Sequence, residues 1–295
     1  CRYVPIGFGL SYTVPIPKVK DCRSKALTCN DFRGIAISPI LSKIFEHCLL
    51  EKFKYFFATD DNQFGFKKGL SCSHAIYSVK NIVDHFIKGG YTANLCSIDL
   101  SKAFDKVNHH ALFIKLMNRY LPVCLLDLLE FWLSNSWSCI KWSDVYSPFF
   151  NICFGVRQGS VLSPFLFAVY LNDLVDGRYN GRYSFVILYA DDILILTSLL
   201  TELQRLLHAC EEELAWLDMS INISKSCCLR IGPRYDFKCY SILTTNGLPL
   251  PWATELRYLG VYILSSRVFK CSQDHAKRAY YRSLNAIFGK IGRSA

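Results

Sequence analysis

Two spacings of apolar residues alternate along the chain and predict two kinds of element. Apolar residues three to four positions apart are typical of a helix that is buried on one face. This spacing predicts helices over residues 39–56, 71–88, 106–119, 125–133, 164–174 and 201–217, and another in the tail from 267. Short β-branched and aromatic runs predict strands over residues 92–100, 139–142, 185–188, 193–196 and 256–263. Residues 1–30, with several prolines and basic residues, are predicted to form a loop.

The first predicted helix has both a start signal and an apolar face. Ser38 before Pro39 predicts an N-cap residue followed by proline at the first helical position. The apolar residues of this helix recur at helical spacing and are expected to be core. They are Ile40, Leu41, Ile44, Phe45, Cys48, Leu49, Leu50 and Phe53. In the helix over residues 201–217, the three consecutive glutamates at 211–213 are expected to form a solvated face.

The sequence Tyr-Ala-Asp-Asp at residues 189–192 lies between two of the short apolar runs. The runs are apolar on both faces, which predicts a hairpin of two strands with both faces covered. Asp191 and Asp192 then stand at the bend, at the edge of a dry layer. Two adjacent carboxylates are unfavourable there unless a cation compensates them, although an isolated Asp-Asp pair is also an ordinary solvated turn. Hard divalent cations such as Mg²⁺ bind carboxylate oxygens and assist phosphoryl transfer.

Other segments supply groups that such chemistry needs. The strand over residues 92–100 carries Asp99 near its end, a third carboxylate that could otherwise be a helix N-cap. Residues 155–164 form a glycine-flanked loop that leads into a helix, and glycines and helix N-termini suit a flat or anionic ligand. The tail from 267 combines an apolar stripe with a basic side, which could track a duplex or lie on a membrane. The nearby aspartates favour the duplex.

Composition narrows the class of protein. The 295 residues suffice for one large or two ordinary domains, and 51% of them are hydrophobic. The 34 basic and 24 acidic residues give a net charge of +10, which favours a polyanionic partner. No apolar stretch reaches the ~20 residues of a membrane span, and the N-terminus does not resemble a signal peptide. Fourteen scattered cysteines without a CxxC pair favour a reduced, intracellular protein over a disulfide or zinc framework, and Cys1 suggests a fragment.

Seven blocks, in this order, resemble the motifs of reverse transcriptases of non-LTR (LINE-type) retrotransposons. They lie at residues 31–46, 63–76, 98–109, 155–164, 189–192, 216–225 and 258–261. They include Gln-Phe-Gly-Phe at 63–66, Asp-Leu-Ser-Lys-Ala-Phe-Asp at 99–105, Arg-Gln-Gly-Ser at 157–160 and Tyr-Leu-Gly-Val at 258–261. Any one of these motifs is common, whereas seven in order are specific. The resemblance covers roughly residues 15–265.

The resemblance implies an α+β fold of the right-hand polymerase type. Its palm is an antiparallel sheet backed by helices, its fingers precede and interleave with the palm, and its thumb is helical. Residues 1–92 would be mostly fingers, residues 93–265 palm with interleaved fingers and connecting segments, and residues 266–295 the start of a thumb. Gly34 stands where relatives usually carry proline, which affects a fingers loop but no reacting group.

The implied activity is extension of a primer 3′-hydroxyl with dNTPs on an RNA template, for retrotransposition. Two Mg²⁺ ions about 4 Å apart, or Mn²⁺ in their place, would clamp the attacking and leaving oxygens. The metal ligands would be Asp99, Asp191, Asp192 and the carbonyl oxygen of Leu100. Lys225 would be the catalytic general acid that protonates the leaving pyrophosphate.

The same resemblance implies residues that bind the nucleotide. Phe104 would be the steric gate that excludes a ribose 2′-hydroxyl, although a core phenylalanine would also fit that position. Gln158 would contact the incoming nucleotide or the template, and Gly159 would allow close approach. Arg33 could pair with the triphosphate, because a guanidinium fork suits phosphate. The competing candidates for this role are Lys18, Lys20 and Arg23.

The implied partners are an RNA template, a DNA primer and dNTPs, with no membrane. Leu259 and Gly260 would belong to the primer grip. The protein would act inside the cell, in the cytoplasm and nucleus. An endonuclease domain would be expected on the full-length polyprotein, outside this chain.

Three alternatives stay open from the sequence alone. A group II intron maturase-like reverse transcriptase would share these motifs, and its intron-binding domain would follow the thumb. A catalytically retired or co-opted copy would only bind RNA, against which the intact aspartates and Lys225 argue. A Mg²⁺-dependent nuclease would also use paired carboxylates, but it would need neither the loop around Gln158 nor a gate at Phe104.

Overall fold

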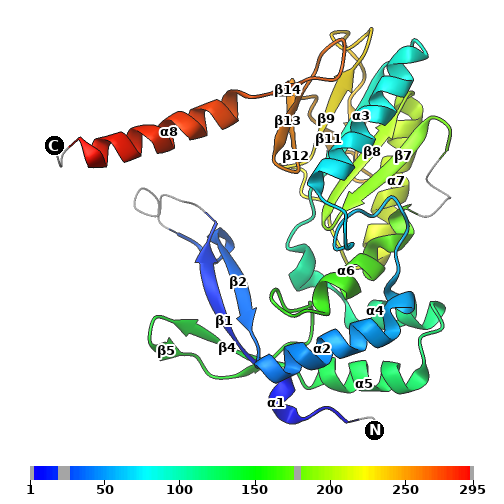
Figure 1. Cartoon of the computed structure of the whole chain (residues 1–295). Coiled ribbons are helices and arrows are strands. Elements are labelled where there is room, and N and C mark those ends of the chain that lie inside the picture. The colour runs from blue at the N-terminus through cyan, green and yellow to red at the C-terminus, as the bar shows by residue number, and fades with distance from the viewer. Residues whose placement is uncertain (1–2, 19–26, 176–180, 293–295) are drawn as a thin grey trace. The chain divides into compact units, whose positions relative to one another are not determined.

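The computed structural model describes residues 3–18, 27–175 and 181–292. The chain forms two compact units, each assembled from three segments that are distant in sequence (Figure 1). The first unit comprises residues 1–68, 100–176 and 212–220. The second unit comprises residues 69–99, 177–211 and 221–295. Both units combine helices with sheets.

The first unit contains a five-stranded sheet. Its strands are β1 (Leu10–Pro17), β2 (Phe32–Ile37), β4 (Trp137–Trp142), β5 (Val145–Tyr146) and β6 (Phe150–Asn151). β1 pairs antiparallel with β2 and parallel with β4, and β4 also pairs with β5 and β6. The strand predicted over residues 139–142 is therefore confirmed.

The prediction of a loop over residues 1–30 is wrong for residues 6–17. The short helix α1 (Ile6–Gly9) leads directly into β1. Pro15 and Pro17 argue against a strand, because proline cannot donate a hydrogen bond to a neighbouring strand. In the structure β4 pairs with β1 only over residues 10–13, so both prolines lie where β1 pairs with β2 alone. Such an edge tolerates proline.

The helices of the first unit enclose its core. They are α2 (Ile40–Phe53), α4 (His109–Asn118), α5 (Val123–Ser134) and α6 (Ser163–Leu171), with 3₁₀ turns at Cys29–Asp31, Lys54–Phe57, Ala103–Lys106 and Asn172–Val175. The predicted helices are confirmed, although α2 and α6 each end as 3₁₀ turns. All of residues 166–171 are buried, and the hydroxyl of Tyr170 donates to Leu217 O at 2.6 Å. Helix α6 is therefore the centre of this core.

The expectation that the whole apolar face of α2 is core is wrong. Ile40, Leu41 and Ile44 are 77%, 67% and 53% exposed. The buried residues of α2 are Ser42, Glu46 and Leu49. The helix also begins one position later than predicted, with Pro39 as its N-cap residue. Helical spacing identifies an apolar stripe, but a glutamate whose oxygens find hydrogen-bond donors can occupy the buried side instead.

A four-stranded antiparallel sheet forms the centre of the second unit. Its strands lie in the order β7 (Ser184–Tyr189), β8 (Asp192–Thr197), β3 (Ala93–Ile98) and β9 (Cys227–Ile231). Figure 1 shows helix α3 (Cys72–Lys88) lying across this sheet, where it contacts β3 and β7, and helix α7 (Leu200–Trp216) follows β8. Residues 186–188 and 193–196 are at most 1% exposed, so both faces of the β7–β8 hairpin are covered, as predicted.

The other strands of the second unit form two small sheets. These are β12 (Glu255–Tyr258), β13 (Val261–Leu264) and β14 (Cys271–Ser272), and separately β10 (Ile242–Leu243) and β11 (Pro249–Leu250). The single strand predicted over residues 256–263 is wrong, because Leu259 and Gly260 form a two-residue turn between β12 and β13. Their φ angles of 46° and 87° are typical of a type I′ hairpin turn.

Helix α8 (Asp274–Ile291) confirms the helix predicted in the tail. None of its described residues is buried. Across residues 3–18, 27–175 and 181–292, every helix is too short or too polar to cross a bilayer.

A buried lysine joins three elements of the first unit. Lys115 on α4 is 6% exposed, and its ammonium lies 2.5 Å from Asp173 Oδ2 and 2.6 Å from Glu213 Oε1. The same ammonium lies 4.6 Å from the ring centre of Trp216. Glu213 therefore does not belong to a solvated face, which corrects the prediction for residues 211–213. A buried ammonium is tolerated here because two carboxylates satisfy its charge.

Replacing Lys115 with methionine preserves an unbranched side chain but leaves two carboxylates without their shared counter-charge. We expect Lys115→Met to lower the free energy of unfolding by about 2–4 kcal/mol, measured by urea denaturation. Lys80→Met is the matched control, since Lys80 is exposed on α3, and it should change this free energy by less than about 0.5 kcal/mol. Equal losses in the two variants would contradict the role assigned to the buried ion pairs.

Candidate active site

The turn between β7 and β8 carries Asp191 and Asp192. Tyr189 pairs with Asp192, so Ala190 and Asp191 are the two turn residues. Ala190 has a φ of 56°, in the left-handed region that costs a residue with a Cβ roughly 1–2 kcal/mol. The buried strands on either side hold this strained turn in place. The strand, tight turn and strand predicted around residues 189–192 are therefore confirmed.

Strand register brings Asp99 to the same end of this sheet. β3 is antiparallel to β8, and Ile98 lies opposite Ile193. Asp99 follows Ile98 by one residue and Asp192 precedes Ile193 by one residue. The register therefore places Asp99 and Asp192 opposite each other, at the end of the sheet that also carries Asp191.

The three carboxylates concentrate negative charge. Desolvation and the negative charges of Asp191 and Asp99 raise the pKa of Asp192 to about 6. The positive charge of Arg257 opposes this rise, and Asp192 stays accessible to solvent. Asp99 Oδ2 is shielded from solvent and accepts no hydrogen bond from the described residues. Hard divalent cations take carboxylate oxygens, so this donor set fits a cation. Within the described ranges, no three His, Cys, Asp or Glu side chains lie close enough together to hold a metal ion.

A loop before β9 places Lys225 beside Asp99. Asn222 N donates to Asp99 O at 2.8 Å. Ser226 Oγ donates to Asn222 O at 2.8 Å and accepts from Asp99 N at 3.1 Å, which ties the loop to the end of β3. The ammonium of Lys225 lies 3.5 Å from Asp99 Oδ2, and the Lys225 side chain is 66% exposed. Lys225 thus supplies positive charge to one of the three carboxylates and stays accessible to a ligand.

The turn between β12 and β13 follows a buried tyrosine that interacts with the carboxylates. Tyr258 is 2% exposed, and burial together with the negative charge of Asp192 raises the pKa of its phenol. The hydroxyl of Tyr258 has no hydrogen-bond partner within the described ranges. Leu259 and Gly260, the predicted primer-grip residues, come directly after it. The structure therefore places this turn in the same unit as the aspartates.

In the first unit, the predicted nucleotide loop is held against strand β2. Gln158 O accepts a hydrogen bond from Ala36 N at 2.7 Å, and the side-chain amide of Gln158 lies 3.5 Å from Asp105 Oδ1. Gly159 has a φ of 128°, and a Cβ added there would lie 2.2 Å from Ala36 O. Close packing against β2 therefore requires glycine at this position, whatever the loop binds.

Phe104 lies in the 3₁₀ turn after β3, in the first unit. Its ring stacks on Phe167, with ring centres 4.4 Å apart and planes 13° apart, and meets the edge of Phe66 at 6.2 Å. Phe104 is half-buried, so it has a core contact and an accessible side. Leu100, the residue after Asp99, is 6% exposed.

Arg33 lies exposed on β2. The ammonium of Lys18, a competing candidate, donates to Asn30 O at 3.0 Å. Lys20 and Arg23, the other two candidates, lie outside the described residues.

The predicted site residues fall into two sets. The second unit holds Asp99, Asp191, Asp192, Lys225, Leu259 and Gly260, and the first unit holds Arg33, Leu100, Phe104, Gln158 and Gly159. Sequence reasoning missed Ser226, although it directly follows Lys225. It also missed Arg257, which opposes the rise in the pKa of Asp192, and it included Glu46 only as the end of the first motif block, without predicting that Glu46 is buried. Adjacency to a motif could have revealed Ser226, whereas burial of Glu46 has no local signal.

A family model described as reverse transcriptase (RNA-dependent DNA polymerase) matches residues 16–263. The match covers most of the chain, so the chain belongs to the reverse transcriptase family. The solved structure of apo telomerase from Candida tropicalis, truncated from its C-terminal domain, matches with a TM-score of 0.64 at 12% identity. The match covers 92% of this chain and 56% of the telomerase chain. At this identity the likeness concerns the fold alone, and it confirms the α+β right-hand polymerase class.

Two curated relatives come from fly mobile elements. "RNA-directed DNA polymerase from mobile element jockey" of Drosophila funebris is 27% identical over 277 residues, which are 88% of this chain and 30% of the relative. "Probable RNA-directed DNA polymerase from transposon X-element" of Drosophila melanogaster is 26% identical over 249 residues, 79% of this chain and 26% of the relative. The chain thus spans less than a third of these relatives. The resemblance to non-LTR retrotransposon reverse transcriptases is confirmed.

The close approach of Gly159 to β2 can be tested by adding a methyl group. We expect Gly159→Ala to lower the free energy of unfolding by about 2–4 kcal/mol, because a left-handed φ is combined with a clash against Ala36 O. Gly247→Ala is the control: Gly247 has a φ of 73° but open space around it, so only the backbone term of about 1 kcal/mol applies. Urea denaturation of both variants measures the difference, and equal losses would exclude the packing constraint.

Proposed function

We propose that this chain is the polymerase domain of a non-LTR retrotransposon reverse transcriptase, which extends a primer 3′-hydroxyl with dNTPs on an RNA template. The observation that carries the proposal is the placement of Asp99, Asp191 and Asp192 at one end of the central sheet of the second unit. Membership of the reverse transcriptase family supports it. An endonuclease domain on a longer polyprotein and action in the cytoplasm and nucleus belong to the same proposal.

The carboxylates would hold the metal ions. Asp99, Asp191 and Asp192, with the carbonyl oxygen of Leu100, would hold two Mg²⁺ ions, or Mn²⁺ in their place. When bound, such ions stabilise the charge that develops on the attacking and leaving oxygens of a phosphoryl transfer. The raised pKa of Asp192 supports this fit, since part of the rise comes from the two neighbouring carboxylates.

Lys225 would act as the general acid for the leaving pyrophosphate. The hydrogen bonds of Asn222 and Ser226 fix the backbone of its loop against Asp99. Its side chain is 66% exposed, so a substrate oxygen can reach the ammonium. An ammonium held by its backbone and open at its tip suits proton donation to a developing anion.

The first unit would recognise the nucleotide. Gln158 would contact the incoming nucleotide or the template through its side-chain amide, which lies 3.5 Å from Asp105 Oδ1, and Gly159 allows the loop to lie close to β2. Arg33, which is exposed, would pair with the triphosphate. Phe104 would present its accessible side to the sugar, with Phe167 supporting the stacked face.

The primer and the subdomains complete the proposal. Leu259 and Gly260 would contact the primer through the hairpin turn between β12 and β13. The division into fingers (1–92), palm with connecting segments (93–265) and the start of a thumb (266–295) stays a prediction. The net charge of +10 favours the nucleic-acid partners that this activity requires.

The decisive assay is extension of a DNA primer on an RNA template with dNTPs and Mg²⁺. We expect the wild-type chain to extend the primer, and Asp99→Asn and Asp191→Asn each to lower the rate by about 10²-fold or more, since each removes a charged ligand. Chelation of Mg²⁺ should also abolish extension. Asp61→Asn, at a side chain that is fully exposed, is the control and should keep the wild-type rate.

The failure modes of this assay have different meanings. A wild-type chain that binds the primer–template without extending it would indicate a retired RNA-binding copy. A primer that becomes shorter would indicate a nuclease. Either outcome would overturn the proposed polymerase.

The gate role of Phe104 predicts a change in sugar selectivity. We expect Phe104→Ala to raise the ratio of rNTP to dNTP incorporation by about tenfold or more, because the side chain would no longer exclude the 2′-hydroxyl. Phe66→Ala, which alters only an edge contact of the same ring, is the control and should leave the ratio unchanged. If Phe104 is only a core residue, Phe104→Ala would lower the incorporation of both nucleotides in parallel.

A further inference from the structure

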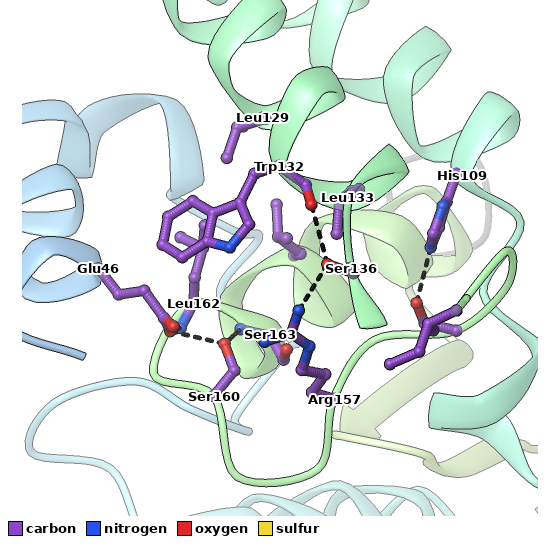
Figure 2. Close-up of a pocket in the computed structure, with 13 residues that line it drawn as sticks. Glu46, His109, Leu129, Trp132, Leu133, Ser136, Arg157, Ser160, Leu162 and Ser163 are labelled. Carbon is purple, nitrogen blue, oxygen red and sulfur yellow. Dashed lines mark hydrogen bonds between the residues drawn. The ribbon is translucent and has the colours of Figure 1, made fainter. Parts of the chain in front are cut away.

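A buried glutamate from α2 bonds the loop that follows Gln158. Glu46 is 3% exposed. Its Oε2 accepts hydrogen bonds from Ser160 Oγ at 2.6 Å and from Leu162 N at 2.7 Å, and Figure 2 shows the first of these bonds at the rim of a pocket. Ser160 Oγ in turn accepts from Ser163 N at 3.2 Å. One carboxylate oxygen therefore organises the backbone from residue 160 to the start of α6.

A second buried charge holds the other side of the loop. The guanidinium of Arg157 donates to Gly9 O at 2.6 Å. It also donates to Ser136 Oγ at 2.6 Å, and Ser136 Oγ donates to Trp132 O at 2.9 Å (Figure 2). Burial lowers the pKa of Arg157, and the negative charge of Glu46 opposes that shift. The two charges thus lie within each other's electrostatic reach.

The pocket between these groups is too small for a substrate. Its volume is about 40 Å³, and its walls include the apolar side chains of Leu129, Trp132 and Leu166. A cavity of this size has room for about one or two water molecules. The buried charges therefore serve the structure around them rather than a separate ligand.

Gln158 and Gly159 lie between the two anchored positions. Arg157 is fixed on one side and Ser160 on the other, and Gln158 O accepts from Ala36 N at 2.7 Å. The backbone of Gln158 is therefore held from three directions. Binding groups act efficiently only when their own positions are fixed in this way, because a misplacement of about 1 Å can cost 10²-fold in rate.

We propose that Glu46 is a positioning residue for nucleotide binding, which acts through Ser160 and Leu162 to hold Gln158 in place. This inference rests on the proposed function, because it assigns to Gln158 the contact with the incoming nucleotide. A carboxylate buried without these hydrogen bonds would be unfavourable, since an isolated buried charge is costly. Leucine at this helical position would bury as well but would leave Ser160 Oγ and Leu162 N without an acceptor.

Four variants separate positioning from a general loss of stability. Glu46→Ala removes the acceptor. Glu46→Gln keeps one side-chain oxygen that can accept both hydrogen bonds and is the conservative rescue. Glu51→Ala is the matched control, because Glu51 lies on the same helix with its side chain 85% exposed. Ser160→Ala removes one of the two hydrogen bonds to Glu46 without altering α2. We call these two bonds, from Ser160 Oγ and Leu162 N, the Glu46 brace. Ser160→Ala therefore tests the Glu46 brace even if Glu46→Ala does not fold.

The kinetic arm measures primer extension on the RNA template at varied dNTP concentration. We expect Glu46→Ala to raise the KM for dNTP about tenfold with a smaller change in kcat, and Glu46→Gln and Glu51→Ala to stay within about twofold of wild type. Ser160→Ala should give an intermediate KM. Its effect should largely vanish in the Glu46→Ala background, because both substitutions break the same bond. Affinity for the primer–template should not change.

A second measurement, hydrogen exchange, does not depend on enzymatic activity. Hydrogen exchange of the Leu162 amide should be faster in Glu46→Ala than in wild type and unchanged in Glu46→Gln and Glu51→Ala. Unchanged exchange in Glu46→Ala would overturn the brace. Faster exchange with an unchanged KM, or a fall in the extension rate by the same factor at every dNTP concentration, would overturn the positioning role. A wild-type chain that extends no primer would instead refute the proposed function, while the exchange arm would still decide whether the brace exists.

Discussion

Burial of the β7–β8 hairpin forces three carboxylates to share one end of a dry sheet. The apolar runs on both sides of residues 189–192 exclude water from both faces, and the antiparallel register with β3 aligns Asp99 with Asp192. Desolvation and then the adjacent negative charges raise the pKa of Asp192, so positive charge nearby stabilises the carboxylates. The crowding of negative charge in the second unit therefore has two causes: hydrophobic burial sets the strand register, and the register places the carboxylates at one end of the sheet.

Hydrogen bonds and positive charges around the three carboxylates offset their mutual repulsion. The loop containing Asn222 and Ser226 bonds both backbone groups of Asp99, so this aspartate is held although its charge is crowded. Lys225 and Arg257 bring positive charge from two different segments. The left-handed Ala190 is a further cost that the flanking strands offset. A site that stores both electrostatic and backbone strain is typical of functional positions.

The first unit uses buried charges to connect segments that are far apart in sequence. Glu46 lies 114 residues before Ser160, and Lys115 lies 98 residues before Glu213, yet each pair is joined by a hydrogen bond of 2.6 Å. An apolar contact in these places would add stability but would not select one arrangement, because it is not directional. A hydrogen bond from a buried charge is directional, and breaking it leaves an unpaired group. These bonds therefore fix how the loops of the first unit lie against its helices.

Local sequence by itself determined the elements that carry the three candidate carboxylates. Apolar runs around residues 189–192 and the strand that ends at Asp99 predicted the hairpin and the third carboxylate, because period and turn chemistry are properties of neighbouring residues. Only the tertiary structure decided that residues 10–17 form a strand, that Leu259 and Gly260 form a turn, and that Glu46 rather than Ile40 is buried. The physical reason is that partners supplied from distant segments decide these features. Pro15 and Pro17 lie on a strand edge, and Glu46 accepts hydrogen bonds from Ser160 and Leu162, only once the chain has folded.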